Sequence, residues 1–140
     1  MRILKLVNYE NLKMEVHAHS LVSQTGDLTA FMRLGTDDTE NYYEIEWPLE
    51  MTPIGSTIDS DIWPEGNKLE IPMAELIRVK KEKNMGTNSL RGDTDEQMIY
   101  GKYKIFVKGN PDLSNVQSVF LGVRNPKTAD GQSHSACVWF

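Results

Sequence analysis

The sequence predicts an all-β fold, an antiparallel β-sandwich of the jelly-roll type with one short helix. Three observations support this prediction. Apolar and polar residues alternate along most of the chain, turn residues separate about seven such runs, and helical spacing dominates only one segment. Alternation with period two is typical of strands that have one buried and one solvated face. Strands that follow one another through turns favour a sandwich over a parallel α/β fold.

Three runs in the first half of the chain carry the alternation. Opposite the inward-facing positions of the third run lie Tyr42, Glu44 and Glu46, so we expect these carboxylates to be in water. Pro48 indicates an edge strand or the end of a strand. The predicted inward-facing residues are Met14, Val16 and Ala18, then Leu28, Ala30, Met32 and Leu34, then Tyr43, Ile45, Trp47 and Leu49.

One segment, residues 72–83, changes the period and predicts the helix. Pro72 suits the first turn of a helix, and Met73, Leu76 and Ile77 recur at helical spacing. Glutamates near its start and lysines near its end complement the helix dipole. An asparagine and a glycine follow as stop signals.

The last forty residues contain three further strand-like runs. Tyr103, Ile105 and Val107 alternate with lysines, whereas residues 116–123 are apolar on both faces and predict a central strand. Residues 134–140 are also expected to be covered on both faces, and the chain stops within this run. We therefore expect residues 1–140 to form one domain, a fragment cut in its last strand, with a polar loop at residues 87–97.

Composition excludes several classes of function. A net charge of −5 and a pI near 5.2 argue against electrostatic binding of nucleic acid or anionic lipid. A single cysteine excludes an internal disulfide framework. Neither a signal peptide nor an apolar run long enough to cross a membrane as a helix is recognisable. A cytoplasmic protein or a piece of a larger exported protein remain, and the ending ACVWF favours the second.

An acidic segment is the candidate metal site. Asp59, Asp61, Glu65 and Asn67 lie close together in sequence, and oxygen-rich loops of this kind bind calcium. Acidic residues that cap their own turns are commoner, and the spacing differs from that of a helix-loop-helix calcium site. We therefore expect no cofactor, with calcium at Asp59, Asp61 and Glu65 as the minor alternative.

No nucleophilic catalytic arrangement can be argued from this sequence. His17 and His19 share one strand face, but no third metal ligand can be placed, so a solvent-facing pair is the simpler interpretation. Cys137 has apolar neighbours and is expected to be a core thiol. The tripeptide RGD at residues 91–93, an adhesion motif in other settings, is treated as a coincidence.

The tryptophans divide into two groups. Trp63, beside Pro64 in a predicted loop, is a candidate glycan contact, because an aromatic ring can stack on a pyranose; packing over a sheet edge is the commoner role. Trp47 and Trp139 have neighbours typical of a core.

Four segments in order carry a resemblance to a known family: YYEIEWPLEMTPIG at 42–55, IWPEGNKLEIPMAELIRVKKEKN at 62–84, KGNPDLSNVQSVFLGVRNPK at 108–127 and ACVWF at 136–140. Together they resemble the SprA/Sov family. Its members are very large cell-surface proteins of Bacteroidetes associated with gliding motility and type IX protein secretion. The likeness covers about the last hundred residues.

The resemblance implies a non-catalytic structural or docking domain of a large SprA-like outer-membrane protein, on its periplasmic or extracellular face. Other parts of the secretion and motility machinery are the implied partners, and no catalytic residue is implied. The residues expected to have architectural roles are Gly109, Asn110, Pro111 and Asp112 in a turn, Gly122 within a strand, Asn125 and Pro126 at its end, and Trp139. We expect Gly122 to permit a close backbone approach.

Two other classes of function stay open at this point. The predicted sandwich is similar to galactose-binding-type carbohydrate modules at the level of the fold alone. A carbohydrate module would need Trp63 or tyrosines exposed around a concave face, and an enzyme would need a polar cleft. We also expect the cut last strand to leave an edge through which two copies could dimerise.

Overall fold

The structure is a computed structural model that describes residues 3–20, 26–84, 98–125 and 136–140. Every strand pairing in this part of the chain is antiparallel, so the prediction of an antiparallel, all-β, sandwich-like fold is confirmed. The strands are β1 (Asn11–Met14), β2 (His17–His19), β3 (Thr29–Gly35), β4 (Tyr42–Pro48), β5 (Leu69–Pro72), β6 (Met98–Tyr100), β7 (Tyr103–Lys108), β8 (Ser118–Arg124) and β9 (Cys137–Trp139). The helical elements are η1 (Leu6–Asn8), α1 (Asp59–Ile62), η2 (Glu65–Asn67) and α2 (Met73–Asn84).

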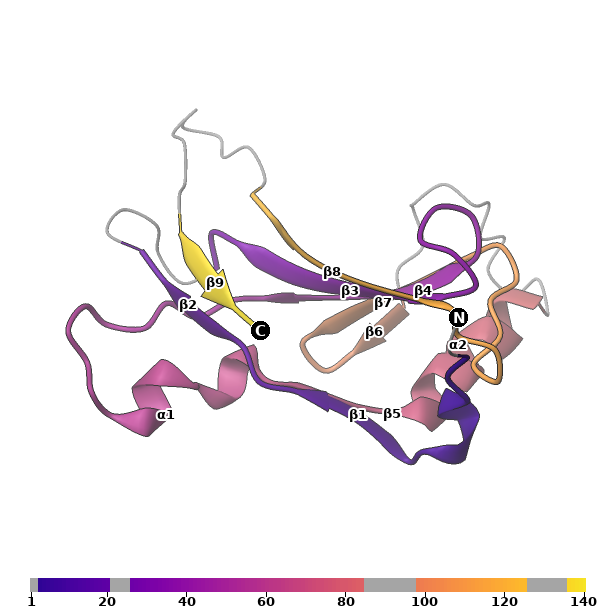
Figure 1. The fold of residues 1–140 in the computed structure, drawn as a ribbon, viewed down its shortest axis with the longest axis horizontal. Helices are drawn as coiled ribbons and strands as arrows, with labels where there is room; N and C mark the ends of the chain where they lie inside the picture. Colours follow the sequence, from indigo (N-terminus) through magenta and orange to yellow (C-terminus); the bar gives the residue numbers. More distant parts are fainter. Residues whose placement is uncertain (1–2, 21–25, 85–97, 126–135) are drawn as a thin grey trace.

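The strands form two layers. The larger is a five-stranded sheet in the order β6-β7-β4-β3-β8. Two ribbons, β1 with β5 and β2 with β9, form the opposing layer, and β1 and β2 follow each other along one stretch of chain. Figure 1 shows the five-stranded sheet above the ribbon of β1 and β5. Pro48 ends β4 at its pairing with Thr29, as the sequence predicts.

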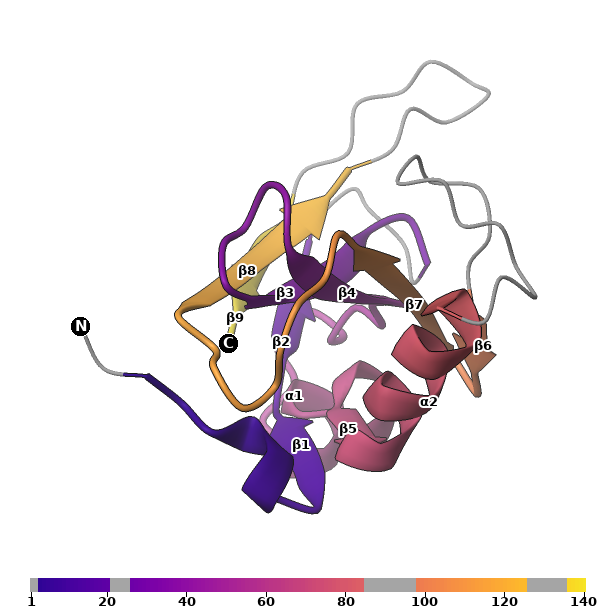
Figure 2. The ribbon, with the colours of Figure 1, turned by 90° about the vertical axis from the view of Figure 1, so that its right-hand side faces the viewer.

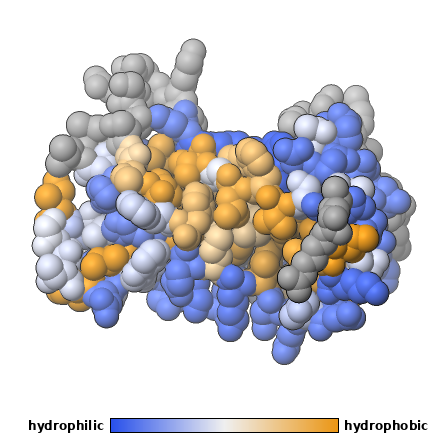
Figure 3. Space-filling model, in the orientation of Figure 1, coloured by the Kyte–Doolittle hydropathy of each residue, from blue (hydrophilic) through white to orange (hydrophobic). Residues whose placement is uncertain are grey.

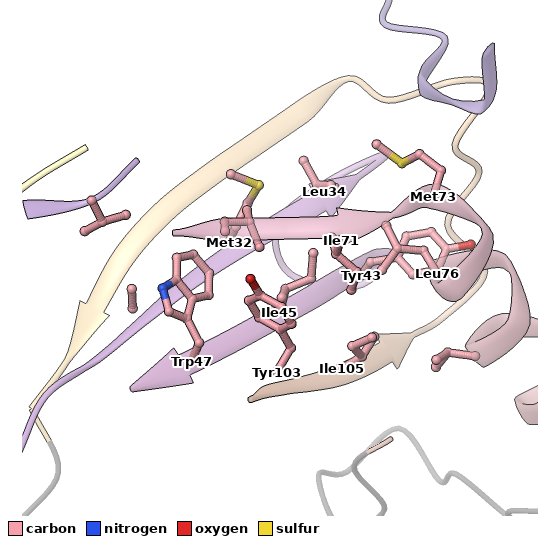
Figure 4. Close-up of a cluster of buried hydrophobic side chains, with 14 of the residues drawn as sticks. Met32, Leu34, Tyr43, Ile45, Trp47, Ile71, Met73, Leu76, Tyr103 and Ile105 are labelled. Carbon is pink, nitrogen blue, oxygen red and sulfur yellow. The ribbon is translucent and has the colours of Figure 1, made fainter. Parts of the chain in front are cut away.

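The core lies between these layers, where the predicted inward-facing residues meet (Figure 4). All of them are buried except Met14, which is half-buried. Trp47 is 1% exposed, and its indole N–H donates a 2.9 Å hydrogen bond to the carbonyl oxygen of Asn67. Each fully buried side chain of this size stabilises the fold by about 1.5–3 kcal/mol. The period-two pattern therefore predicted correctly which residues form the core between the two layers.

Helix α2 begins one residue later than predicted, because Pro72 still belongs to β5 and pairs with Asn11. Its buried residues include Met73, Leu76 and Val79. Ile77, expected on the same face, is 45% exposed. The helix packs against β5 and β7, on the opposite side of the molecule from β8 (Figure 2). Its position leaves the β8 side of the sandwich without this cover.

Candidate docking surface

Strand β8 is an edge strand, and the prediction of a central strand at residues 116–123 is wrong. Among the described strands, β3 is its one neighbour. Val119 is 49% exposed, and Leu121 and Val123 are each 37% exposed. We call these three residues the β8 strip. The apolar run suggested burial on both faces. Burial also requires another part of the molecule to pack on the strand, and the apolar pattern does not show whether one does.

The β8 strip is a continuation of the core. Directly opposite residues of an antiparallel pair share one face of the sheet, and the strip lies opposite Leu34, Met32 and Ala30 of β3. Those three residues are buried, whereas the strip is not. In Figure 3, apolar side chains gather across the middle of the face that Figure 1 shows with β8 and β9 nearest the viewer. In the part of the chain that the structure describes, one side of the sandwich is therefore open.

The backbone of the β8 strip also faces outward. Leu49 donates its N–H to the carbonyl oxygen of Leu28 over 2.9 Å, which makes this a hydrogen-bonded pair in the β3 and β4 register. Because bonding direction alternates along a strand, even-numbered residues of β3 bond to β4 and odd-numbered residues bond to β8. Phe120 and Gly122 therefore bond to β3. The N–H and C=O groups of the β8 strip point to the open edge, where no described strand pairs with them.

The N-terminal segment meets this edge only before β8 begins. Leu4 and Val116 exchange two backbone hydrogen bonds of 3.0 Å as an isolated antiparallel bridge. No bridge from the described part of this segment reaches residues 118–124.

The opposite face of the same sheet carries a charged cluster that the sequence did not predict. Glu44 is 5% exposed, so the expectation that it lies in water is wrong. It accepts hydrogen bonds of 2.8 Å from Arg33 of β3 and from Arg124 of β8, and Arg124 also bonds to Glu46. Burial by itself raises the pKa of Glu44, but the bonds from Arg124 and Arg33 outweigh it and hold this pKa below its usual value. The cluster ties β8 to β4 across β3.

Phe31 completes this outer face. Its ring lies over Gly122, where an added Cβ would come within 2.5 Å of a ring carbon. The expected close approach at Gly122 is thus made by an aromatic ring rather than by backbone. The guanidinium carbon of Arg124 lies 4.3 Å from the centroid of the Phe31 ring, and the Phe120 ring lies 5.8 Å away. On the outer face Phe31 covers Gly122, but Phe120 is 43% exposed, so β8 is partly exposed on both faces.

The predicted turn at Gly109 precedes the connection to β8. Gly109 has φ of +64°, and a side chain there would also meet the carbonyl oxygen of Glu40. The N–H of Asn110 donates to Oδ1 of Asn41 over 3.0 Å. These contacts join the turn to the hairpin between β3 and β4.

The next two motif residues extend this arrangement. The carbonyl oxygen of Pro111 accepts a 2.5 Å bond from Nζ of Lys80 in α2, and Oδ1 of Asp112 accepts bonds from the hydroxyl and N–H of Ser114. These bonds lower the pKa of Asp112. Burial, together with the charge of Asp112, raises the pKa of Tyr43 to about 12. Asn125 directly follows β8, and Pro126 lies outside the described residues.

The last strand differs from its prediction. Strand β9 pairs with β2, but Cys137 is exposed and Trp139 is 60% exposed. The expectations of a core thiol and of a core tryptophan are therefore wrong. Phe140 is also exposed, and His134 lies outside the described residues. As for β8, the apolar composition of β9 predicted more burial than the structure shows.

Trp63 lies beside the histidine pair. It is 42% exposed, and its ring meets His17 edge-on with centroids 5.8 Å apart. His17 Nε2 lies 2.9 Å from His19 Nδ1, and His17 Nδ1 lies 2.7 Å from the carbonyl oxygen of Ile62. A neighbouring cavity of about 320 Å³ is lined by both histidines and by Thr52 among other residues. A second cavity, of about 490 Å³, is lined by Tyr43, Lys80 and Asp112 among other residues.

The acidic segment does not gather into one cluster. Asp59 and Asp61 belong to α1, a short helix absent from the predictions, and Glu65 belongs to η2. Asp61 accepts a 2.8 Å bond from Ser56, while Asn67 is buried and its side chain bonds to the backbone of residue 50. Within the described ranges, no group of three or more His, Cys, Asp or Glu residues is placed to hold a metal ion. The RGD tripeptide and the predicted loop at 87–97 lie outside those ranges.

The geometry defines a class of protein: an antiparallel, all-β, sandwich-like domain with an open apolar edge. Residues 2–140 match the SprA_N family, described as a motility related/secretion protein. Because the match covers nearly the whole chain, the chain belongs to this family, and the resemblance seen in the sequence is confirmed. A comparison with curated proteins gave no match. No described helix is long and apolar enough to cross a membrane.

Proposed function

We propose that this chain is a non-catalytic docking domain of a large SprA-like protein that acts in gliding motility and type IX secretion. Its family membership supports the link to motility and secretion. We place the domain at the cell surface or outer membrane, on the periplasmic or extracellular face. Its partners in this proposal are other components of that machinery.

The observation that carries the docking role is the open core at β8. Three apolar side chains that continue the core are 37–49% exposed, and the backbone groups of the same three residues face an edge where no described strand pairs with β8. Burying apolar area contributes about 25 cal/mol per Å², so covering the strip is favourable. An edge strand of this kind is also a template for pairing with another chain. The surface has the properties of an interface rather than of a catalytic cleft.

Substitution in the complete protein, in its own host, tests the docking role. Leu121→Lys puts a charge into the β8 strip and is expected to reduce surface spreading and secretion at least tenfold while leaving the protein level unchanged. The matched control is Ile99→Lys on β6, the other edge of the sheet, where Ile99 is 67% exposed. Normal motility and secretion in the Leu121→Lys strain would contradict a docking role for β8.

A carbohydrate-binding module is the second candidate. The exposed ring of Trp63 and the neighbouring cavity at His17 favour it. A glycan array with the purified chain, with and without calcium, tests it. Reproducible binding that Trp63→Ala abolishes would support this candidate, and binding only with calcium would also support the minor alternative of a calcium ion at Asp59, Asp61 and Glu65. The docking proposal expects no glycan signal.

A further inference from the structure

The second cavity lies among parts of the chain that are far apart in sequence. It has a volume of about 490 Å³ and is lined by Val7 of η1, Ile77 of α2 and Leu113 in the connection from β7 to β8, among other residues. Pockets of this size hold small ligands. No residue of the β8 strip lines it, so this cavity is distinct from the docking surface.

Hydrogen bonds join the elements around this cavity. The backbone N–H groups of Leu6 and Val7 both donate to the carbonyl oxygen of Leu113, over 2.7 and 3.2 Å. Nζ of Lys80 in α2 donates to the carbonyl oxygen of Pro111 over 2.5 Å. Both η1 and α2 are therefore joined to the same connection, and the cavity between them is held in shape before any ligand binds.

Tyr43 brings a hydroxyl group without a partner to this cavity. The residue is 2% exposed and lines the cavity, and in Figure 4 its hydroxyl lies at the end of the core nearest α2. Every completely buried side-chain N or O atom in the described part of the chain has a hydrogen-bond partner. The Tyr43 hydroxyl has no such partner among the described residues, so it retains access to solvent through the cavity that the residue lines.

The surroundings of this hydroxyl make it a donor. The charge of Asp112, which also lines the cavity, contributes to the raised pKa of Tyr43, so the phenol lies near this carboxylate. With a pKa of about 12, the hydroxyl is protonated at neutral pH and can donate a hydrogen bond. Asp112 already accepts bonds from the hydroxyl and N–H of Ser114. A ligand with a strong acceptor would complete the bonding of Tyr43.

The lysines of α2 give the cavity an excess of positive charge. Ile77, Lys80 and Lys81 have the spacing i, i+3, i+4, which puts them on one face of the helix, and all three line the cavity. Neither lysine forms an ion pair with a described residue. Among the described residues that line the cavity, Asp112 is the one carboxylate. Two ammonium groups and one carboxylate favour an anion.

Apolar side chains line the rest of the cavity. Val7 is 46% exposed and Ile77 is 45% exposed, while Leu113 beside them is buried. The sequence predicted Ile77 on the buried face of α2, and its place at the cavity accounts for its exposure. An apolar body between Val7 and Ile77 would remove both side chains from water, which is favourable.

We infer that this cavity binds a small amphipathic carboxylate. Its apolar body lies between Val7 and Ile77, and its carboxylate accepts a hydrogen bond from the Tyr43 hydroxyl and pairs with Lys81. A fatty acid of medium length and the C-terminus of a short apolar peptide share this chemistry. The inference goes beyond the proposed docking function, because the cavity and the β8 strip have no residue in common.

A titration of the 140-residue chain followed by NMR tests this inference. The probes are sodium octanoate and acetyl-leucyl-leucine, with octylammonium as the control of opposite charge. We expect saturable shifts at the amides of Ile77, Lys81 and Leu113, with a dissociation constant of about 1 mM or lower for at least one carboxylate. The probe that binds more tightly identifies the source of the carboxylate. Octylammonium is expected not to bind.

Three variants assign the contacts. Tyr43→Phe removes only the hydroxyl and should weaken carboxylate binding about fivefold without lowering stability, because that hydroxyl has no described partner. Lys81→Gln should weaken binding by a similar factor of about five. The matched control is Lys104→Gln on β7, which removes the same charge from an exposed position outside the cavity and should leave binding unchanged. Circular dichroism checks that each variant folds.

The opposite results are equally specific. The inference is overturned if neither carboxylate gives saturable shifts at about 10 mM. Equal binding of octylammonium would contradict the preference for an anion. Folded Tyr43→Phe and Lys81→Gln variants that bind octanoate and the dipeptide as well as the wild type does would show that these residues form no such site. A loss of stability in Tyr43→Phe, measured by urea unfolding, would show that the hydroxyl has a partner within the chain.

Discussion

Strands β4 and β8 flank β3 on its two sides, yet they depart from the burial that their sequences predict in opposite directions. Strand β4 carries Glu44 at a position predicted to face water, and this carboxylate is buried between Arg33 and Arg124. Strand β8 carries apolar residues on both faces and is exposed on its core side. Hydropathy alone would assign β8 to the centre of the sheet and the charged face of β4 to solvent.

The comparison shows that burial depends on position in the sheet as well as on residue type. Strand β4 lies between β3 and β7, and Glu44 is paired with Arg33 of β3 and, across β3, with Arg124 of β8. Strand β8 lies at the edge, where the second layer does not reach. An apolar strand in such a place is either an aggregation hazard or an interface. The docking proposal treats β8 as an interface.

The largest expected effect compares two residues that lie opposite Met32. Ile45→Ala in β4 should cost about 2–5 kcal/mol of unfolding free energy, because Ile45 is fully buried and a cavity would remain. Leu121→Ala in β8 should cost less than about 1 kcal/mol in the monomer, because the side chain is already partly in water. Urea unfolding below the concentration of self-association measures both. Equal losses would mean that β8 is covered in solution.

The next effect concerns the charged cluster. Glu44→Gln should destabilise the chain by about 1–3 kcal/mol, since Arg33 and Arg124 lose the carboxylate that they share. The matched control is Glu40→Gln. Glu40 is exposed and pairs with Lys108 only at 3.7 Å, so the change should be below about 0.5 kcal/mol. If urea unfolding shows the same loss of unfolding free energy in both variants, Glu44 is solvated and does not form a buried ion pair.

A smaller effect tests the packing of β8 on its outer face. Gly122→Ala should cost about 1–2 kcal/mol, because the new methyl group would overlap the Phe31 ring unless the ring moves. In a Phe31→Leu background the same change should cost clearly less, and the double-mutant cycle measures the coupling between the two positions. Additive costs would show that Phe31 does not pack on Gly122.

The smallest expected effect is a dependence on pH. The folded pKa of Glu44 lies below its usual value of 4.5, so the stability that its ionised form adds is complete above about pH 4.5 and is lost as the pH falls through the folded pKa. The difference in unfolding free energy between wild type and Glu44→Gln should therefore shrink as the pH falls below about 4.5. If this difference in unfolding free energy instead grows as the pH falls, the pKa of Glu44 is raised rather than lowered by folding.

Much of the fold could be predicted from the sequence, because the relevant signals are local. Alternation placed Ile45 and Trp47 in the core, Pro48 ended its strand, and helical spacing located α2 within one residue at each end. These features depend on residues close together in the chain. Family membership was likewise readable from segments in order along the chain.

The candidate site could not be predicted in the same way. The edge position of β8 follows from strand order, which is set by pairings between distant residues. The cluster around Glu44 joins residues eighty positions apart, and no local pattern connects it with Arg124. The sequence shows Arg33 between apolar residues, but it does not show that Glu44 is the ion-pair partner of Arg33. The exposure of Trp139 follows from the absence of a covering layer rather than from any property of its own segment.

Hydrogen exchange at the amides of β8 tests the central claim, that the backbone edge of this strand is open. In dilute chain, the amides of Val119, Leu121 and Val123 should exchange quickly, while those of Phe120 and Gly122, bonded to β3, should exchange slowly. Slow exchange of the Val119, Leu121 and Val123 amides in dilute chain would contradict the open edge.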